Sequence, residues 1–204
     1  MIIKTVIAGV YDENCYIAMD EETKEAVIMD PGGNFDKIVD AIEKMGANPK
    51  FILLTHGHFD HVGAVDELKG KYGIKSFISE DDEKMIDKKE SAFGPLEKSD
   101  GYIHDNDMFK IGNIEIKAIK TPGHTPGGMC FLIEKNLFSG DTLFRESIGR
   151  SDFPGGSFSQ LVNGIKAKLM ILPDDVVVYP GHNASSTIGH ERLNNPFLGD
   201  MYAY

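Results

Sequence analysis

The feature that most restricts the fold is a cluster of metal-binding residue types placed directly after an apolar run. Residues 51–54 have the composition of a strand inside a sheet, and they lead into the loop that holds His56, His58, Asp60 and His61. Gly57 lets this loop bend without a Cβ clash, so the side chains can turn toward one point. Imidazole and carboxylate groups together suit zinc, iron or manganese. Four such groups, if half-buried, need partners, and a metal ion supplies them.

The same arrangement, an apolar strand followed by small residues and a ligand-type side chain, occurs three more times. His124 lies in the rigid turn 121–127, Asp141 follows the apolar run that starts at Leu137, and His182 follows a strand and the pair Pro180-Gly181. A lone histidine after a strand is more often a surface or structural residue than a ligand. Together with the first loop, however, these positions provide five histidines and two aspartates. Seven ligands are enough for two metal ions with one bridging carboxylate.

Strands and helices alternate along the chain, which indicates an α/β fold. Rigid strand ends are where such folds place functional side chains. Residues 89–107 mix charge, glycine and proline, which predicts a loop or lid. The sequence shows no repeat or composition break, so we expect a single domain over residues 1–204. Strands are expected at 2–8, 14–19, 25–29, 51–54, 76–79, 108–111, 114–120, 128–133, 137–140 and 176–179, and helices at 36–45, from 60 through 68, from 80, and at 158–172.

Composition excludes several classes of function. A net charge of −11 argues against a protein that binds the phosphate backbone of nucleic acids, since such binding needs clustered Lys and Arg. Neither a signal peptide nor an apolar run of about 18 residues is found, so we expect a soluble, cytoplasmic protein with no membrane partner. Cys15 and Cys130 are too few for a disulfide framework and lie in apolar stretches, so we expect buried thiols.

The order of these residues resembles the metallo-β-lactamase superfamily, and the resemblance covers nearly the whole chain. The pattern His-x-His-x-Asp-His at 56–61 is followed by separate His, Asp and His positions, and Asp30 is similar to the aspartate of the superfamily's first motif. The resemblance implies an αβ/βα sandwich, in which two mixed β-sheets lie face to face with helices outside and metals at one edge. By motif, one metal would be held by His56, His58 and His124, the other by Asp60, His61 and His182, and Asp141 would bridge them.

Within the superfamily, residues 139–144 and Asn195-Pro196-Phe197 resemble glyoxalase II and its short relatives, which hydrolyse hydroxyacylglutathione thioesters. The resemblance implies two divalent ions, with zinc expected and iron or manganese as alternatives, and a small-molecule thioester as substrate. Two such ions lower the pKa of a shared water from 15.7 toward about 7, which gives hydroxide at neutral pH. Asp60 would be catalytic, both as a ligand and by orienting this nucleophile. A thiolate is a good leaving group, so no strong general acid is needed.

Two departures from glyoxalase II concern the substrate. Full-length members have a C-terminal helical domain that helps to bind glutathione, whereas 22 residues follow His182 here, so we expect no such domain. The loop 145–153 has Arg150 where those enzymes have a lysine that touches glutathione, and Asp152 where they have a tyrosine. Arg145 and Arg150 are the candidate substrate-binding residues. An ion pair between Arg150 and Asp152 that only stiffens the loop is an equal alternative.

Other functions remain open at this stage. A persulfide dioxygenase resembles glyoxalase II in fold but uses one iron. Its iron-binding positions would correspond here to His56, His124 and Asp141, a two-histidine, one-carboxylate triad. A nuclease of the superfamily is disfavoured by the acidic charge, and a non-catalytic metal-binding scaffold is a third alternative. The sequence does not predict the oligomeric state.

Overall fold

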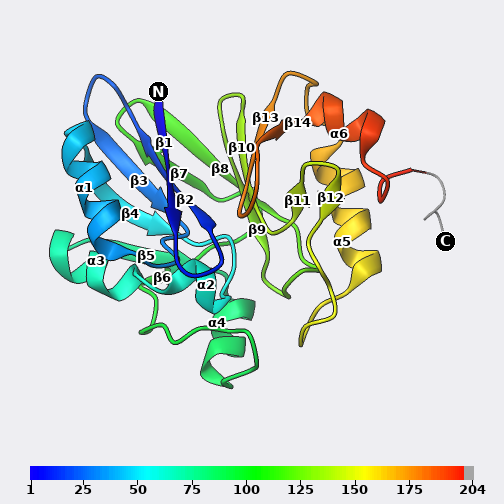
Figure 1. The fold of residues 1–204 in the computed structure, drawn as a ribbon, viewed down its shortest axis with the longest axis horizontal. Helices are drawn as coiled ribbons and strands as arrows, with labels where there is room; N and C mark the ends of the chain where they lie inside the picture. Colours follow the sequence, from blue (N-terminus) through cyan, green and yellow to red (C-terminus); the bar gives the residue numbers. More distant parts are fainter. Residues whose placement is uncertain (200–204) are drawn as a thin grey trace.

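Two mixed β-sheets lie between layers of helices in a computed structural model that describes residues 1–199 (Figure 1). The first sheet has the strand order β1 (Ile2–Ala8), β2 (Glu13–Met19), β3 (Glu25–Met29), β4 (Asn48–Leu53), β5 (Lys75–Ile78) and β6 (Gly101–Tyr102). The second has the order β14 (Ser186–Thr187), β13 (Val177–Pro180), β10 (Asn136–Gly140), β9 (Met129–Ile133), β8 (Ile114–Lys120) and β7 (Met108–Ile111), and β11 (Leu143–Phe144) pairs with β12 (Ser147–Ile148). The helices are α1 (Phe35–Met45), α2 (Phe59–Val62), α3 (Val65–Tyr72), α4 (Glu80–Asp87), α5 (Phe158–Gly164) and α6 (Ile188–Asn194).

The layers follow from the alternation of side chains along each strand. In β2, Cys15 and Ile17 pack in the core cluster beneath α1 and α3, whereas Tyr16 and Ala18 pack against the second sheet. Every residue of β2 is buried because both faces of its sheet are covered. The outer face of the second sheet packs on α5, where Leu161 is buried. This arrangement confirms the predicted αβ/βα sandwich of two mixed sheets.

The sheet topology brings the predicted site residues to one edge of the sandwich. Strands β3 and β4 are parallel, as are β10 and β13, so within each sheet the loops that leave these strands lie side by side. The two sheets are tied together there, because the Asn14 amide donates to the Gly181 carbonyl at 2.7 Å and the Met129 amide donates to the Thr55 carbonyl at 2.8 Å. The strand ends of both sheets therefore face a common space.

Two predicted helices differ from those observed. The helix expected from Asp60 through Leu68 is broken between α2 and α3, because the Ala64 amide donates to the Pro31 carbonyl at 2.9 Å instead of continuing the helix. A Cβ at Gly63 would lie 2.5 Å from the Gly32 carbonyl oxygen, so the chain is also in close contact there. The helix predicted at 158–172 is α-helical only to Gly164, and a π-helical turn follows over Ile165–Leu169.

The segment 89–107 is mostly loop, as predicted, but it is bonded to the loop after β4. The Phe59 amide donates to the Ala92 carbonyl at 3.0 Å, and the Gly94 amide donates to the Gly57 carbonyl at 3.1 Å. Its last part contains the short strand β6. The segment therefore supports the site loop from one side, which the expectation of a lid did not include.

Cys15 in β2 and Cys130 in β9 are fully buried free thiols, as expected. Burial raises the pKa of the Cys15 thiol well above its usual value, so this group is inert at neutral pH.

Across residues 1–199, the helices are all too short or too polar to pass through a lipid bilayer.

Candidate metal centre

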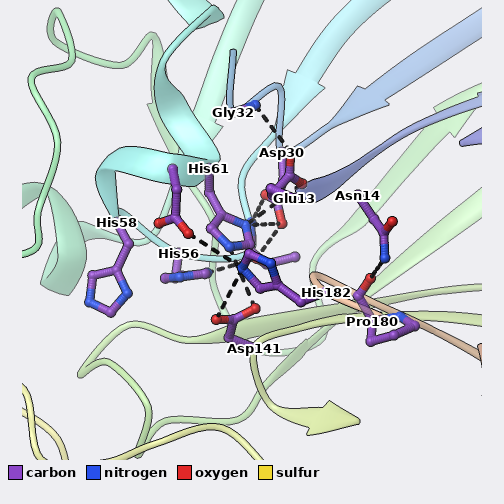
Figure 2. Close-up of polar contacts among 12 residues, drawn as sticks. Glu13, Asn14, Asp30, Gly32, His56, His58, His61, Asp141, Pro180 and His182 are labelled. Carbon is purple, nitrogen blue, oxygen red and sulfur yellow. Dashed lines mark hydrogen bonds and ion pairs between the residues drawn. The ribbon is translucent and has the colours of Figure 1, made fainter. Parts of the chain in front are cut away.

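All the ligand-type residues predicted from the sequence meet at the common edge of the two sheets. One potential ligand atom from each of His56, His58 and His124 lies within 4.8 Å of the others, and the same holds for Asp60, His61 and His182. His56 and His58 follow β4, Asp60 and His61 lie on α2, His124 is in the loop after β8, and Asp141 and His182 follow β10 and β13. Figure 2 shows His61, His182 and Asp141 converging from these different elements.

Asp141 lies between the two clusters. Its Oδ1 is 3.5 Å from His61 Nε2, and its Oδ2 is 3.5 Å from His124 Nε2 and 3.8 Å from His182 Nε2. One carboxylate thus faces histidines of both clusters, which is the position that the resemblance implies for a bridging residue.

Four of the five histidines are held in one orientation by the nitrogen that points away from the centre. In each, Nδ1–H donates to a fixed oxygen, so Nε2 has a lone pair whenever the ring is neutral. The acceptors are Thr55 Oγ1 for His56 at 3.0 Å, Asp30 Oδ2 for His61 at 3.1 Å, the Arg150 carbonyl for His124 at 2.6 Å and the Tyr11 carbonyl for His182 at 3.2 Å. His58 differs, since its Nδ1 faces His124 Nε2 at 3.0 Å.

The pKa shifts favour the ligand forms of most of these groups. Burial, together with the neighbouring imidazoles, lowers the pKa of His56 well below its usual value, and burial lowers the pKa of His58 to about 3. Both rings are therefore neutral at pH 7, with lone pairs available. Burial acts to raise the pKa of Asp141, but His61 outweighs it and the pKa falls below its usual range. His61 and His182 are the exceptions: burial opposes the protonation of both rings, yet Asp141 and Asp30 raise the pKa of His61 well above normal, and Asp60 and Asp141 raise the pKa of His182.

Metal ions fit this donor set. The Nε2 atoms of His56 and His61 and Oδ1 of Asp141 are buried and have no hydrogen-bond partner among residues 1–199. His124 Nε2 carries a lone pair aimed at another ring nitrogen, and this contact is favourable only if a proton or a cation lies between them. Unpaired buried acceptors that converge on one point are costly unless a cation satisfies them. His61, protonated without metal, would release its proton on binding.

Asp30 and Glu13 hold the second cluster from the side opposite Asp141 (Figure 2). Asp30 accepts hydrogen bonds from the Thr55 amide at 2.7 Å and the Thr55 hydroxyl at 2.5 Å, and its backbone has a positive φ of 48°. Glu13 is fully buried, accepts from the Gly32 amide at 3.3 Å and lies 3.9 Å from His61 Nδ1. Burial raises the pKa of Glu13 well above its usual value. Glu13 could not be recognised from the sequence, because nothing there distinguishes it from any other residue that begins a strand.

A cavity of about 360 Å³ opens beside the clusters. Its walls include the aromatic rings of Tyr11, Phe59 and Phe153, which the sequence analysis did not single out. Arg150 also lines it, but the guanidinium donates to both oxygens of Asp152 at 2.7 and 2.6 Å and stacks on Phe153 at 4.0 Å from the ring centroid. The stiffening ion pair considered above is therefore present. Arg145, the other candidate, is exposed in the turn between β11 and β12 and is not among the described residues that line this cavity.

The chain is similar to known proteins over nearly its whole length. Residues 8–182 match the family model of the metallo-beta-lactamase superfamily. The chain is 36% identical to the hydroxyacylglutathione hydrolase GloC of Haemophilus influenzae, over 97% of this chain and 98% of the relative. A crystal structure of the BLEG-1 B3 metallo-beta-lactamase has a TM-score of 0.88 at 33% identity, with 97% and 99% of the two chains covered. TTHA1623 in a di-iron-bound form has a TM-score of 0.84 at 33% identity, with 96% of this chain and 100% of that chain covered. The protein described here therefore belongs to the metallo-beta-lactamase superfamily.

Proposed function

We propose that the protein is a hydrolase of small-molecule thioesters that works with two divalent metal ions, zinc being the expected metal. His56, His58 and His124 would hold one ion, and Asp60, His61 and His182 the other, with Asp141 shared between them. The observation that carries the proposal is the set of anchored histidines, whose free ring nitrogens face one space beside Asp141. The similarity to GloC, a hydroxyacylglutathione hydrolase by name, supports the thioester class.

The residues around the cavity have separate roles in this proposal. When bound, the metal ions would supply Lewis acidity and lower the pKa of water. Asp60 lines the cavity and lies 3.3 Å from His182 Nε2. Burial acts to raise the pKa of Asp60, but His182 outweighs it and keeps the pKa below normal. Asp60 is therefore a carboxylate at neutral pH, and it can accept a hydrogen bond from a nucleophilic water and orient it toward a carbonyl carbon.

Metal content is the first test. Protein reconstituted with excess zinc should contain two ions per chain by elemental analysis, and a chelator should reduce thioester hydrolysis to background. At a free metal concentration of 100 times Kd, binding should also stabilise the fold by about 2.7 kcal/mol, measured by urea denaturation with and without metal. A stoichiometry that stays at one ion would contradict the dinuclear site. It would favour the mononuclear iron persulfide dioxygenase, which needs only His56, His124 and Asp141.

Substrate range is the second test. The aromatic walls suit an apolar group, and Arg150 is already paired with Asp152, so few charged contacts remain for the carboxylates of glutathione. A charge-assisted contact is worth about 1.5–3 kcal/mol. We therefore expect kcat/KM for a lactoyl thioester of glutathione to be within about 100-fold of that for the thioester of a small neutral thiol.

The variant Asp152→Asn provides the matched control for this comparison. It removes the negative charge that occupies Arg150 but leaves the aromatic walls unchanged. The glutathione thioester should then gain in kcat/KM, while the neutral thioester should not. A preference for glutathione above about 100-fold in the unaltered protein, equivalent to about 2.7 kcal/mol, would show a dedicated tripeptide site and contradict the expected range.

A further inference from the structure

A buried carboxylate from α4 lies between the two loops that form the first cluster. Asp82 is fully buried and accepts three hydrogen bonds. Its Oδ2 accepts from the Gly57 amide at 2.9 Å and from the Thr125 hydroxyl at 2.8 Å, and its Oδ1 accepts from the Gly127 amide at 2.7 Å. Gly57 stands between His56 and His58, and Thr125 directly follows His124. One side chain therefore bonds to both loops that carry the histidines of the first cluster.

The local structure is built around this carboxylate. The Ser79 side chain accepts from the Asp82 amide at 3.2 Å and begins α4, which fixes the position of Asp82 in the first turn. A Cβ at Gly127 would lie 2.6 Å from Asp82 Oδ1, and a Cβ at Gly57 would lie 3.1 Å from Ile86 Cδ1. Glycine is thus required at Gly127, and Gly57 has little spare room, because both loops approach α4 closely.

The charge of Asp82 matches its surroundings. Burial raises its pKa to about 6, whereas the three donated hydrogen bonds act to lower it. At neutral pH most molecules therefore carry the carboxylate, which has an acceptor for every donor that faces it. A carboxylate that accepts several hydrogen bonds in a buried position holds its donors in a narrow range of geometry.

We propose that Asp82 is a positioning residue that sets the distance between the loop of His56 and His58 and the loop of His124, and so fixes the first metal site in its binding geometry. This inference rests on the proposed function, because it takes the cluster to be a metal site. The second cluster is held in other ways: Asp60 and His61 lie on α2, and His182 follows β13. Loss of Asp82 should therefore lower the affinity for one of the two metal ions more than for the other.

The neighbouring residue Glu83 offers a matched control. It is also a buried carboxylate on α4 and also accepts three hydrogen bonds, from the Ser99 amide at 2.8 Å, the Ser99 hydroxyl at 2.6 Å and the Tyr102 hydroxyl at 2.7 Å. Ser99 lies just before β6 and Tyr102 lies within it, so neither partner belongs to a loop that carries a metal-ligand candidate. Glu83→Ala and Asp82→Ala should both lower stability, but only Asp82→Ala should change metal binding.

The experiment is a Co²⁺ titration of the metal-free protein in competition with a chelator, followed by visible absorption, for the unaltered chain and the variants Asp82→Ala, Asp82→Asn and Glu83→Ala. In the unaltered chain we expect two ions. In Asp82→Ala the affinity for one ion should fall by about 10- to 100-fold, with a changed visible spectrum for that ion. Asp82→Asn should be intermediate, since its amide oxygen can replace only one of the two carboxylate oxygens. Glu83→Ala should match the unaltered chain in both affinities and in its spectrum.

The possible outcomes separate this inference from the proposed function. If the unaltered chain binds no Co²⁺, both are refuted. If the unaltered chain and the Asp82 variants bind two ions with equal affinity and the same spectrum, the inference alone is refuted, and Asp82 only stabilises the fold as Glu83 does. Should Asp82→Ala fail to fold, Asp82→Asn and Thr125→Val, which removes a single bond at nearly constant volume, carry the same comparison.

Discussion

Replacing Asp141 with asparagine should remove one metal ion per chain and lower kcat by a factor on the order of 10²–10³. The amide has nearly the shape of the carboxylate but carries no negative charge. Asp141 faces histidines of both clusters, at 3.5 Å from His61 Nε2 and 3.5 Å from His124 Nε2, so the lost charge is the one that two neighbouring cations would share. Without it, the repulsion between the cations is no longer offset.

Elemental analysis and steady-state kinetics on the same preparation would measure this effect. The fold should be retained, as judged by circular dichroism, because Asp141 lies at a strand end outside the three hydrophobic clusters. Asp175→Asn is a suitable control, since this exposed aspartate pairs with Lys135 at the opposite end of β13. Two bound ions and near-normal turnover in Asp141→Asn would be incompatible with a bridging role.

The second large effect is expected for Gly181→Ala. A Cβ at this position would overlap Asp141 Oδ1 and would lie 2.7 Å from His61 Cε1. The added methyl group would thus enter the space between the carboxylate and the imidazole and push them apart. We expect a loss of about 1–3 kcal/mol in the free energy of unfolding from overpacking. Because the displaced groups belong to the site, metal content and kcat/KM should fall as well, the latter by roughly 100-fold or more.

Gly70→Ala is the matched control for this substitution. Gly70 lies within α3, and no heavy atom is within 4 Å of a Cβ built there, apart from its chain neighbours and the backbone of its own helix. Alanine is the better helix former, so this variant should gain about 0.5–1 kcal/mol of stability and keep its activity. Urea denaturation and metal analysis of the two variants would separate the effects. A Gly181→Ala protein with two ions and normal kcat/KM would show that the space between Asp141 and His61 does not matter.

The sequence by itself determined the fold class and the place of the site. Short runs rich in Ile and Val between turn residues mark strands whichever partner they later meet, and β1, β2 and β3 begin and end within one residue of the predicted ranges. Ligand-type residues stand out when they directly follow such runs, because a polar cluster at a strand end has no role in packing. His56 and Asp141 could be found in this way, as could His182, without knowledge of any contact.

Only the tertiary structure decided which other side chains support that site. Asp82 belongs to a run of four acidic residues, and its burial appears only when α4 packs against the loops at Gly57 and Gly127. Glu13 likewise looks like a solvated acid until β2 is covered on both faces. The break in the helix at Gly63 also depends on a contact with Gly32, a residue far away in the chain. Local patterns encode which side chains prefer to be buried, whereas the partner of a buried polar group is set by the packing of distant segments.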